Sequence, residues 1–279
     1  MPELPEVETI KEALKKSVEG ARIDSVIVRN KKFRQPVPDD FADTIKNGTI
    51  TKIYRKAKYI VLDLDNGNSI IWHLGMSGKI KIISTHDYEL EKHDHIILKT
   101  NRDTLIYNDA RRFGLITSEK TSNINDISLF NKIGIDPFDE NLNTDYLLGK
   151  LKNKKTPIKV SLLDQSIING IGNIYASEAL FEAGISPLRE SCTITDNEAS
   201  LLIKAIIKTL TKAIKAGGST LRDYRKPDGS MGYFQNQHCV YSKEGKKCPD
   251  CTCNIAISGG IKKIVQGGRS TYYCTTKQK

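Results

Sequence analysis

The sequence predicts an α+β protein with a β-rich first segment led by a helix, a helical second segment and a cysteine-containing hairpin at the end. Three observations predict this order. Runs rich in Ile, Val, Leu and Tyr fill residues 22–120, apolar residues recur at helical spacing after residue 150, and five of the six cysteines lie in the last 41 residues. We therefore expect three domains, spanning residues 1–132, 133–235 and 236–279.

Composition and charge narrow the class of protein. The chain has 279 residues, enough for about two domains at roughly 100–200 residues each. Lys and Arg number 43 against 33 Asp and Glu, so the formal net charge is +10, which favours a polyanionic partner, nucleic acid or an anionic membrane surface. No apolar run approaches the ~18 residues of a membrane span, and the acidic N-terminus lacks a signal-peptide core. We expect a cytoplasmic protein.

The first segment begins with a helix and continues as strands. Four apolar residues share one helical face: Val7, Ile10, Leu14 and Val18. Pro5 suits the first helical turn and Gly20 the C-terminal cap. The strand-like runs cover residues 22–29, 50–63, 69–83, 95–99 and 104–118. Residues 65–67 (Asp-Asn-Gly) and 100–103 have the composition of hairpin turns between strands.

The second segment is helical after a polar stretch. Residues 121–150 have the composition of a linker. Helices are predicted over residues 157–166, 174–183 and 196–216. Thr195 and Glu198 form a capping box for the third of these helices, and Gly217 ends it. The Gly- and Asp-rich residues 217–236 then predict a flexible loop.

The cysteines near the C-terminus have the spacing of a metal site. In a cytoplasmic chain such cysteines favour metal binding over disulfides. Cys248 and Cys251 form a C-x-x-C knuckle that can share one tetrahedral zinc ion, and Cys274 lies where a second knuckle would begin. The position expected for the fourth ligand holds Lys277 instead.

Two interpretations of this tail remain open. In the first, Cys253, or less favourably Cys239 or His238, supplies the fourth zinc ligand. In the second, the segment is a β-hairpin without zinc. Residues 262–269 between the knuckle and Cys274 are basic and contain Gly267-Gly268. On a hairpin these glycines would let the turn approach a phosphate, although a solvated basic turn has the same composition.

The N-terminus carries groups suited to covalent chemistry. Initiator methionine is generally removed before a residue as small as proline, which would leave Pro2 with a free secondary amine. An α-amino group has a pKa near 7.7–8, so a substantial fraction is nucleophilic at neutral pH. Glu3 and Glu6 lie beside it as a proton donor and an orienting carboxylate. The alternative is that these residues only start a helix.

Ten motifs in order carry a resemblance to a known family. They are residues 1–9 (MPELPEVET), 55–59 (RKAKY), 73–78 (HLGMSG), 92–95 (KHDH), 109–114 (DARRFG), 155–159 (KTPIK), 170–178 (GIGNIYASE), 217–221 (GGSTL), 232–234 (GYF) and 268–271 (GRST). The chain resembles the formamidopyrimidine-DNA glycosylases. The resemblance implies a β-sandwich, a helical domain with a helix–two-turns–helix element and a zinc-finger-like hairpin.

The resemblance also implies an activity and its residues. The family excises 8-oxoguanine and formamidopyrimidines from duplex DNA and then breaks the strand on both sides of the abasic sugar. By similarity, Pro2 attacks C1′ and forms a Schiff base, Glu3 donates a proton at the sugar, and Glu6 supports the site. Lys58, which we expect on a strand, matches the lysine of β-elimination. Arg269 matches the arginine of δ-elimination, and its guanidinium suits bidentate phosphate contacts.

Further residues match the family's DNA contacts. Met76, Arg111 and Phe113 correspond to the side chains that fill the void left by the extruded base, with Arg111 pairing with the orphaned cytosine. Phosphate contacts are implied for His93, Lys154, Lys159 and Asn173. The loop 217–236 resembles the one that closes over the flipped base. Two features depart from the pattern: Lys277 replaces the last cysteine, and about six extra residues separate Cys251 from Cys274.

We therefore expect a monomeric bifunctional DNA glycosylase and AP lyase of base excision repair. Its partner would be damaged double-stranded DNA in a bacterial-type nucleoid, with no membrane partner and with one zinc ion. The nearest rival is an endonuclease VIII-like glycosylase for oxidised pyrimidines. Leu4, the Arg111-Arg112-Phe113 motif and the long 217–236 loop argue against this rival.

A non-catalytic binder of damaged DNA is the rival from another class. The net charge, the hairpin and the helical turn would serve such a binder equally well. Pro2, Glu3 and Lys58 separate the two hypotheses, because a binder needs no free secondary amine beside a carboxylate.

Overall fold

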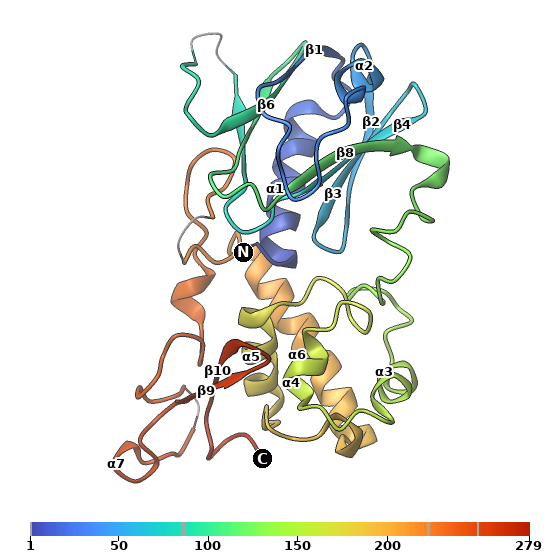
Figure 1. Cartoon of the computed structure of the whole chain (residues 1–279). Coiled ribbons are helices and arrows are strands. Elements are labelled where there is room, and N and C mark those ends of the chain that lie inside the picture. The colour runs from blue at the N-terminus through green and yellow to red at the C-terminus, as the bar shows by residue number, and fades with distance from the viewer. Residues whose placement is uncertain (1, 85–87, 222–223, 250) are drawn as a thin grey trace. The chain divides into compact units, whose positions relative to one another are not determined.

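A computed structural model describes residues 2–84, 88–221, 224–249 and 251–279 (Figure 1). The chain divides into two compact units. The β unit comprises Met1–Asn131 with Ile214–Gln235, and the helical unit comprises Lys132–Ala213 with Asn236–Lys279. Within the described residues, no helix is both long and apolar enough to cross a membrane.

The β unit is a two-sheet sandwich with a leading helix, as predicted. Its elements are α1 (Leu4–Val18), β1 (Ile23–Val28), α2 (Phe41–Ile45), β2 (Ile50–Lys56), β3 (Tyr59–Leu64), β4 (Asn68–His73), β5 (Lys79–Ile83), β6 (Asp94–Thr100), β7 (Thr104–Asn108), β8 (Leu115–Lys120) and the 3₁₀ turn η1 (Thr121–Asn123). One sheet has the order β1-β6-β7-β5 and the other β2-β3-β4-β8. All neighbouring strands are antiparallel.

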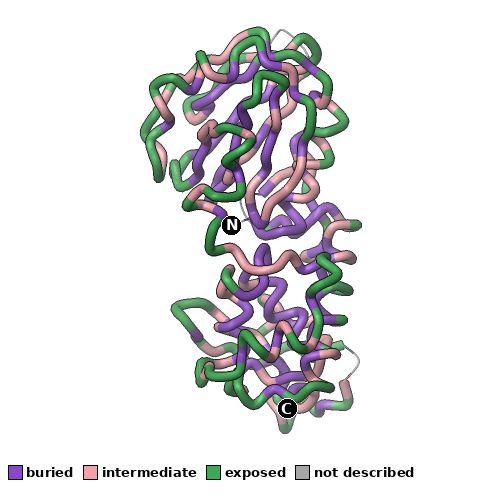
Figure 2. Tube along the Cα trace, turned by 90° about the vertical axis from the view of Figure 1, so that its right-hand side faces the viewer, coloured by how far each residue is buried: buried purple, intermediate pink, exposed green. Residues whose placement is uncertain are grey.

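One apolar core joins the two sheets and the leading helix. It includes Leu62, Ile70 and Trp72 from one sheet, Ile96, Leu98 and Tyr107 from the other, and the predicted face of α1 with Val7, Ile10, Leu14 and Val18. Buried residues run along the strands in Figure 2. Because strand side chains alternate between faces, this core fixes the register of both sheets.

Three predicted strand runs are each divided in the structure. Residues 50–63 form β2 and β3, residues 69–83 form β4 and β5, and residues 104–118 form β7 and β8. Each break is short and contains at least one apolar residue, such as Ala57, Met76 or Phe113, so periodicity did not reveal it. In particular, Lys58 was expected on a strand, which is wrong: it lies in the two-residue Ala57-Lys58 turn between β2 and β3. The turns at residues 65–67 and 100–103 are confirmed.

The rest of the chain is mostly helical and ends in the predicted hairpin. Its elements are α3 (Thr144–Leu151), α4 (Ile158–Leu162), α5 (Asn173–Ala183), η2 (Ser191–Thr193), α6 (Asp196–Lys215), η3 (Phe234–Gln237), α7 (Ile255–Ser258), β9 (Lys262–Gln266) and β10 (Arg269–Tyr273). The capping box before α6 is confirmed: the Thr195 N–H donates to the Glu198 carboxylate at 2.9 Å. Gly217 follows α6 with φ +73°.

Two helical predictions needed correction. The polar stretch 121–150 is not only a linker, because it contains all of α3 except its last residue. Asn143 caps α3 by accepting the Tyr146 N–H, and Leu147 and Leu151 are buried, which is enough to fix a two-turn helix. The helix predicted over 157–166 ends at Leu162. Past that end, the Gln165 side chain donates to the Ile171 carbonyl and accepts the Gly170 N–H.

Candidate active site and nucleic-acid interface

Glu6 connects the start of α1 to the loop after α6 within the β unit. Pro2, Glu3 and Glu6 are all buried. The Glu3 N–H donates to Glu6 Oε2 at 2.8 Å, and the Ser219 N–H donates to Glu6 Oε1 at 2.7 Å. Gly218 has φ +78°, and a Cβ there would lie 2.8 Å from Glu6 Oε1. One carboxylate therefore holds the residue after Pro2 and the loop together. Met1, whose removal we expect, lies outside the described residues.

The loop 217–236 is hydrogen-bonded along its described parts, which leave out residues 222 and 223. The Gly232 N–H donates to Thr220 Oγ1 at 2.8 Å, and the Phe234 N–H donates to the Gly218 carbonyl at 3.0 Å. The Tyr224 hydroxyl donates to the Gly217 carbonyl at 3.1 Å. Burial and the nearby Glu6 carboxylate raise the pKa of Tyr224. These bonds keep the start of the loop beside Glu6.

Lys58 lies in a turn that is clamped to α1. The Lys58 side chain is buried, and Ala57 before it has φ +54°. The Arg55 guanidinium donates to the Ala57 carbonyl at 3.0 Å and to Glu8 on α1 at 2.8 Å. Because the guanidinium bonds both the turn and the helix, the backbone that carries Lys58 is fixed relative to the helix that begins at the N-terminal residues.

His73 is a candidate site residue that the sequence analysis did not single out. It pairs with Tyr59 in the β3–β4 register, which brings it close to Lys58. Burial and the Lys58 charge lower the pKa of His73 to about 4. Its Nδ1 accepts the Gly75 N–H at 3.1 Å, so the neutral ring carries its proton on Nε2. Counting the register back from the turn at residues 65–67 would have paired it with Tyr59.

Met76, Arg111 and Phe113 project from two loops of the β unit. Met76 is 39% exposed and Phe113 is 46% exposed, whereas most apolar residues of the β unit are buried. The Arg111 guanidinium lies 4.6 Å from the centre of the Phe113 ring. His93 lies next to the loop that carries Arg111 and Phe113. Its carbonyl accepts the N–H of Asp109, the first residue of that loop, at 3.1 Å. Exposed apolar side chains on fixed loops suit insertion into a base stack.

Asn173 is the centre of a polar cluster in the helical unit. Buried Lys159 donates from Nζ to Asn173 Oδ1 at 2.5 Å. The Asn173 amide donates to the Ser270 carbonyl at 2.8 Å and to the Tyr241 hydroxyl at 3.3 Å. Arg269 precedes Ser270 and is exposed at the tip of the β9–β10 hairpin. The cluster therefore brings together Lys159, Asn173 and the backbone next to Arg269.

Tyr241 was missed by the sequence analysis, and no sequence signal points to it. It reaches the cluster because buried Glu178 on α5 accepts three consecutive backbone N–H groups, those of Cys239, Val240 and Tyr241, at 2.7, 3.0 and 2.8 Å. Lys154 belongs to a different contact, since its Nζ lies 3.6 Å from Asp164 Oδ2 and its side chain is partly exposed.

Four cysteine thiols form a compact group at the end of the helical unit. The Sγ atom of Cys248 lies 3.3 Å from those of Cys253 and Cys274, and the Cys251 and Cys274 Sγ atoms are 3.7 Å apart. All four Sγ atoms lie within 4.8 Å of one another. A disulfide would need about 2.05 Å, whereas a tetrahedral zinc ion with Zn–S near 2.3 Å separates sulfurs by about 3.8 Å. The donor set and spacing fit zinc.

The sequence matches two models of one protein family. The formamidopyrimidine-DNA glycosylase N-terminal domain matches residues 1–116, and the formamidopyrimidine-DNA glycosylase H2TH domain matches residues 133–225. A formamidopyrimidine-DNA glycosylase of Rhodospirillum rubrum is 42% identical over 282 residues, covering 100% of both chains. One of Rickettsia africae is 44% identical over 279 residues, covering 100% of this chain and 99% of the relative. The chain belongs to the formamidopyrimidine-DNA glycosylase family.

Solved structures of this family share the fold. A Lactococcus lactis FPG mutant in complex with DNA containing Fapy-dG is 35% identical, with a TM-score of 0.90 and coverage of 99% of both chains. A complex of the Lactococcus lactis Fpg with DNA containing an abasic site is also 35% identical, with a TM-score of 0.89 and the same coverage.

In this chain, the fourth position of the cysteine group differs from the one that a second knuckle predicts. The fourth thiol is that of Cys253; His238 and Cys239 are not members of the group. Lys277, which stands where the last cysteine was expected, places its Nζ 4.1 Å from the centre of the Phe181 ring on α5. The lysine therefore makes a cation–π contact in place of ligation. The short helix α7 lies within the lengthened interval between Cys251 and Cys274.

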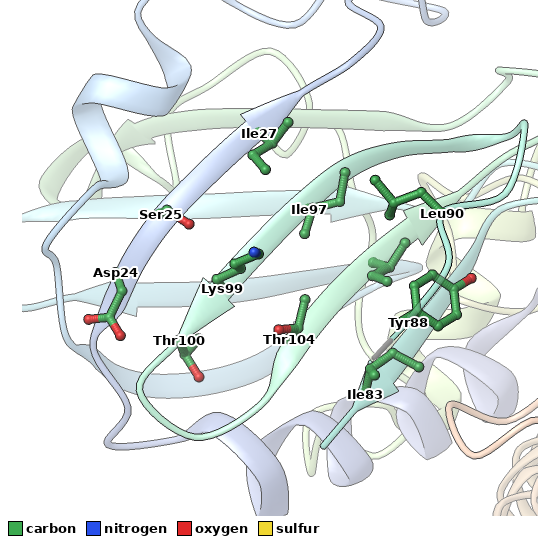
Figure 3. A pocket seen from close by; sticks show the side chains of 11 residues that line it. Asp24, Ser25, Ile27, Ile83, Tyr88, Leu90, Ile97, Lys99, Thr100 and Thr104 are labelled. Atoms are coloured by element: carbon green, nitrogen blue, oxygen red, sulfur yellow. The ribbon is translucent and has the colours of Figure 1, made fainter. Parts of the chain in front are cut away.

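A separate hollow lies on the β1-β6-β7-β5 sheet (Figure 3). Its lining residues are Asp24, Ser25, Ile27, Ile83, Tyr88, Leu90, Ile97, Lys99, Thr100, Thr104 and Ile106. Along β6 and β7 these alternate with core residues such as Leu98 and Leu105, so the hollow is on the sheet face that points away from the core. It contains none of the predicted site residues.

Proposed function

We propose that this protein is a bifunctional DNA glycosylase and AP lyase that removes oxidised purines, and processes abasic sites, in duplex DNA during base excision repair. The observation that carries the proposal is the N-terminal arrangement, in which Pro2 and Glu3 precede a helix whose Glu6 anchors them to a glycine loop. The full-length relatives that bear the glycosylase name support the same activity.

The chemistry begins with the secondary amine of Pro2 after Met1 is removed. Its nitrogen attacks C1′ of the damaged nucleotide, the glycosidic bond breaks, and the base leaves with the proton that the amine gives up. Opening of the sugar gives a Schiff base, and Glu3 supplies the proton that the ring oxygen takes. The cationic iminium is an electron sink, so the C2′ proton is lost and the bond to the 3′ phosphate breaks; a second elimination releases the 5′ phosphate.

Lys58 and His73 act on the sugar–phosphate beside this centre. Lys58 supplies a buried positive charge and takes part in β-elimination. His73 is neutral near pH 7 and donates from Nε2, so it adds a hydrogen bond without a second charge. The Arg55 contacts described above keep the Lys58 turn in place, which matters because small displacements of catalytic groups are costly.

Each unit contributes its own contacts to DNA. In the β unit, Met76, Arg111 and Phe113 fill the gap left by the extruded base, Arg111 pairs with the orphaned cytosine, and the loop 217–236 closes over the base. The phosphate-binding residues are Lys154, Lys159, Asn173 and Arg269 in the helical unit and His93 in the β unit. Lys159 acts through Asn173, because its Nζ is buried against the Asn173 amide. Arg269 also assists δ-elimination.

One zinc ion, held by Cys248, Cys251, Cys253 and Cys274, stabilises the hairpin that presents Arg269. Zinc here is structural and takes no part in the reaction. Because Cys253 is the fourth ligand, Cys253→Ser should lower the bound zinc from about one ion per chain to well below half, and DNA binding should fall with it. The matched control is Cys239→Ser, in the same segment but outside the thiol group.

Elemental analysis of the purified full-length variants checks this prediction. Full zinc occupancy in Cys253→Ser, or an equal loss in Cys239→Ser, would contradict the ligand assignment.

The domain division 1–132, 133–235 and 236–279 is proposed as the functional one along the chain, with catalytic, helical and hairpin parts. The end of the second part, residues 214–235, belongs to the compact β unit. The protein works as a monomer on chromosomal DNA in the cytoplasm. The net charge of +10 supports a DNA partner.

A substrate panel tests the proposed specificity. Excision of 8-oxoguanine opposite cytosine should exceed excision of thymine glycol by at least about tenfold in single-turnover rate. The pyrimidine activity is worth measuring because a Lactococcus lactis Fpg has been solved with DNA containing an oxidised pyrimidine. The reverse order of rates would favour the endonuclease VIII-like function. Damage-selective binding without any cleavage would favour a non-catalytic binder.

A further inference from the structure

Two loops of the β unit run next to each other because of the sheet topology. The β4–β5 loop, residues 74–78, passes from the β2-β3-β4-β8 sheet to the β1-β6-β7-β5 sheet, and the β7–β8 loop, residues 109–114, makes the return passage. Since β4 pairs with β8 and β5 pairs with β7, both loops begin and end on paired strands. The first loop carries Met76, and the second carries Arg111 and Phe113.

A buried carboxyl group bonds the two loops to each other. Asp109 is 0% exposed. Its Oδ1 accepts the Ser77 hydroxyl at 2.5 Å, and its Oδ2 accepts the Gly114 N–H at 2.9 Å. The Ser77 oxygen in turn accepts the Arg111 N–H at 3.1 Å. Ser77 follows Met76 directly, Arg111 lies two residues before Phe113 and Gly114 directly after it, so these bonds hold the backbone next to the three exposed side chains.

The backbones of the two loops are also in close contact. Gly75 has φ +63°, and a Cβ at this position would lie 2.4 Å from the carbonyl carbon of Phe113. Arg112 has φ +57°, an unusual conformation for a residue with a side chain. Such a close backbone contact, with a strained conformation at Arg112, persists only when surrounding contacts enforce it. The Asp109 and Ser77 bonds are such contacts.

We propose that Asp109 and Ser77 lock the two loops into one block, so that Met76, Arg111 and Phe113 enter the base stack together. The inference rests on the proposed function, in which these three side chains replace the extruded base. Asp109 and Ser77 are positioning residues: they touch the loops and not the reacting atoms. Their contribution therefore belongs to base extrusion and to recognition of the opposite base, and not to the bond-breaking steps.

The Ser77→Ala variant tests this coupling. Alanine removes the hydroxyl that joins Asp109 to the Arg111 N–H, while the fold of the sheets keeps its apolar core. Single-turnover excision of 8-oxoguanine opposite cytosine should fall about 10- to 100-fold, whereas cleavage at a preformed abasic site should stay within about threefold, because that substrate has no base to extrude. The preference for cytosine over adenine opposite the lesion should also fall.

Ser69→Ala is the matched control. Ser69 is fully buried on β4 and donates to Asp63 Oδ1 at 2.6 Å. Its replacement by alanine therefore removes an equivalent serine–aspartate bond away from the two loops. Comparable thermal unfolding midpoints for the two variants would separate positioning from general destabilisation. The proposal is overturned by a Ser77→Ala variant that excises as fast as Ser69→Ala, or that loses both activities equally.

A second readout needs no chemistry. The fluorescence of 2-aminopurine placed beside a tetrahydrofuran site in duplex DNA reports unstacking when the protein binds. Its rise should be smaller with Ser77→Ala than with the unaltered protein and Ser69→Ala, and an equal rise in all three would overturn the coupling. Failure of the unaltered protein to excise 8-oxoguanine would contradict the proposed function, while this fluorescence measurement would still decide the coupling.

Discussion

A Pro2→Gly variant should lose base excision and strand cleavage by at least ~100-fold while still binding duplex DNA. Glycine leaves a primary amine without the pyrrolidine ring, so the nucleophile is no longer a secondary amine held in one geometry. Binding should survive because the phosphate contacts lie on other residues, and phosphate contacts dominate affinity for DNA. Single-turnover cleavage of an 8-oxoguanine duplex and a binding titration at fixed salt measure the two effects.

The control for this variant is Pro5→Ala, which changes the other proline of the same segment within the first turn of α1. It should retain activity within a few-fold, since alanine is the best helix former. Mass measurement of each protein establishes that Met1 has been removed. Full excision and cleavage by Pro2→Gly would remove Pro2 from its assigned role.

Glu6→Gln should be the next most damaging change, with a loss of excision of about 10- to 100-fold. Both Glu6 oxygens accept backbone N–H groups, from Glu3 and from Ser219. A glutamine amide accepts with only one of its two ends, so one buried N–H would face another donor. Leaving a buried donor unsatisfied costs about 1–3 kcal/mol, and here the cost falls on the backbone next to Pro2 or on the loop.

Glu12→Gln on the same helix is the control for Glu6→Gln. Glu12 is exposed and its partner is Lys11, so this ion pair contributes little. Rates of excision and of abasic-site cleavage should match those of the unaltered protein. If Glu6→Gln excised 8-oxoguanine at the same rate as Glu12→Gln, the anchoring role of Glu6 would be wrong.

Much of the fold was predictable because local signals agreed with burial. The apolar stripe of α1, the Thr195–Glu198 capping box before α6 and the turn at residues 65–67 each have a local physical cause, and each is present. The structural features that the sequence did not predict are those that depend on tertiary contacts. The strand breaks are short and contain apolar residues such as Met76 and Phe113, and α3 depends on two buried leucines and one asparagine cap.

The candidate site shows the same limit. The motifs indicated Pro2, Glu3 and the void-filling residues, but they did not single out His73, whose proximity to Lys58 follows only when the strand register is counted from the turn at residues 65–67. The preference for Cys253 over His238 and Cys239 is confirmed, but the sequence alone left the other two open. That choice depends on how the segment after Cys248 folds back on Cys274.

The most direct test of the account is borohydride trapping of the unaltered protein on a duplex with 8-oxoguanine opposite cytosine, followed by mass mapping of the cross-linked peptide. We expect a covalent adduct on an N-terminal Pro2, which would establish the nucleophile, the loss of Met1 and the substrate class together. An adduct on Lys58, or damage-selective binding with no adduct at all, would contradict the central claim that Pro2 forms the Schiff base.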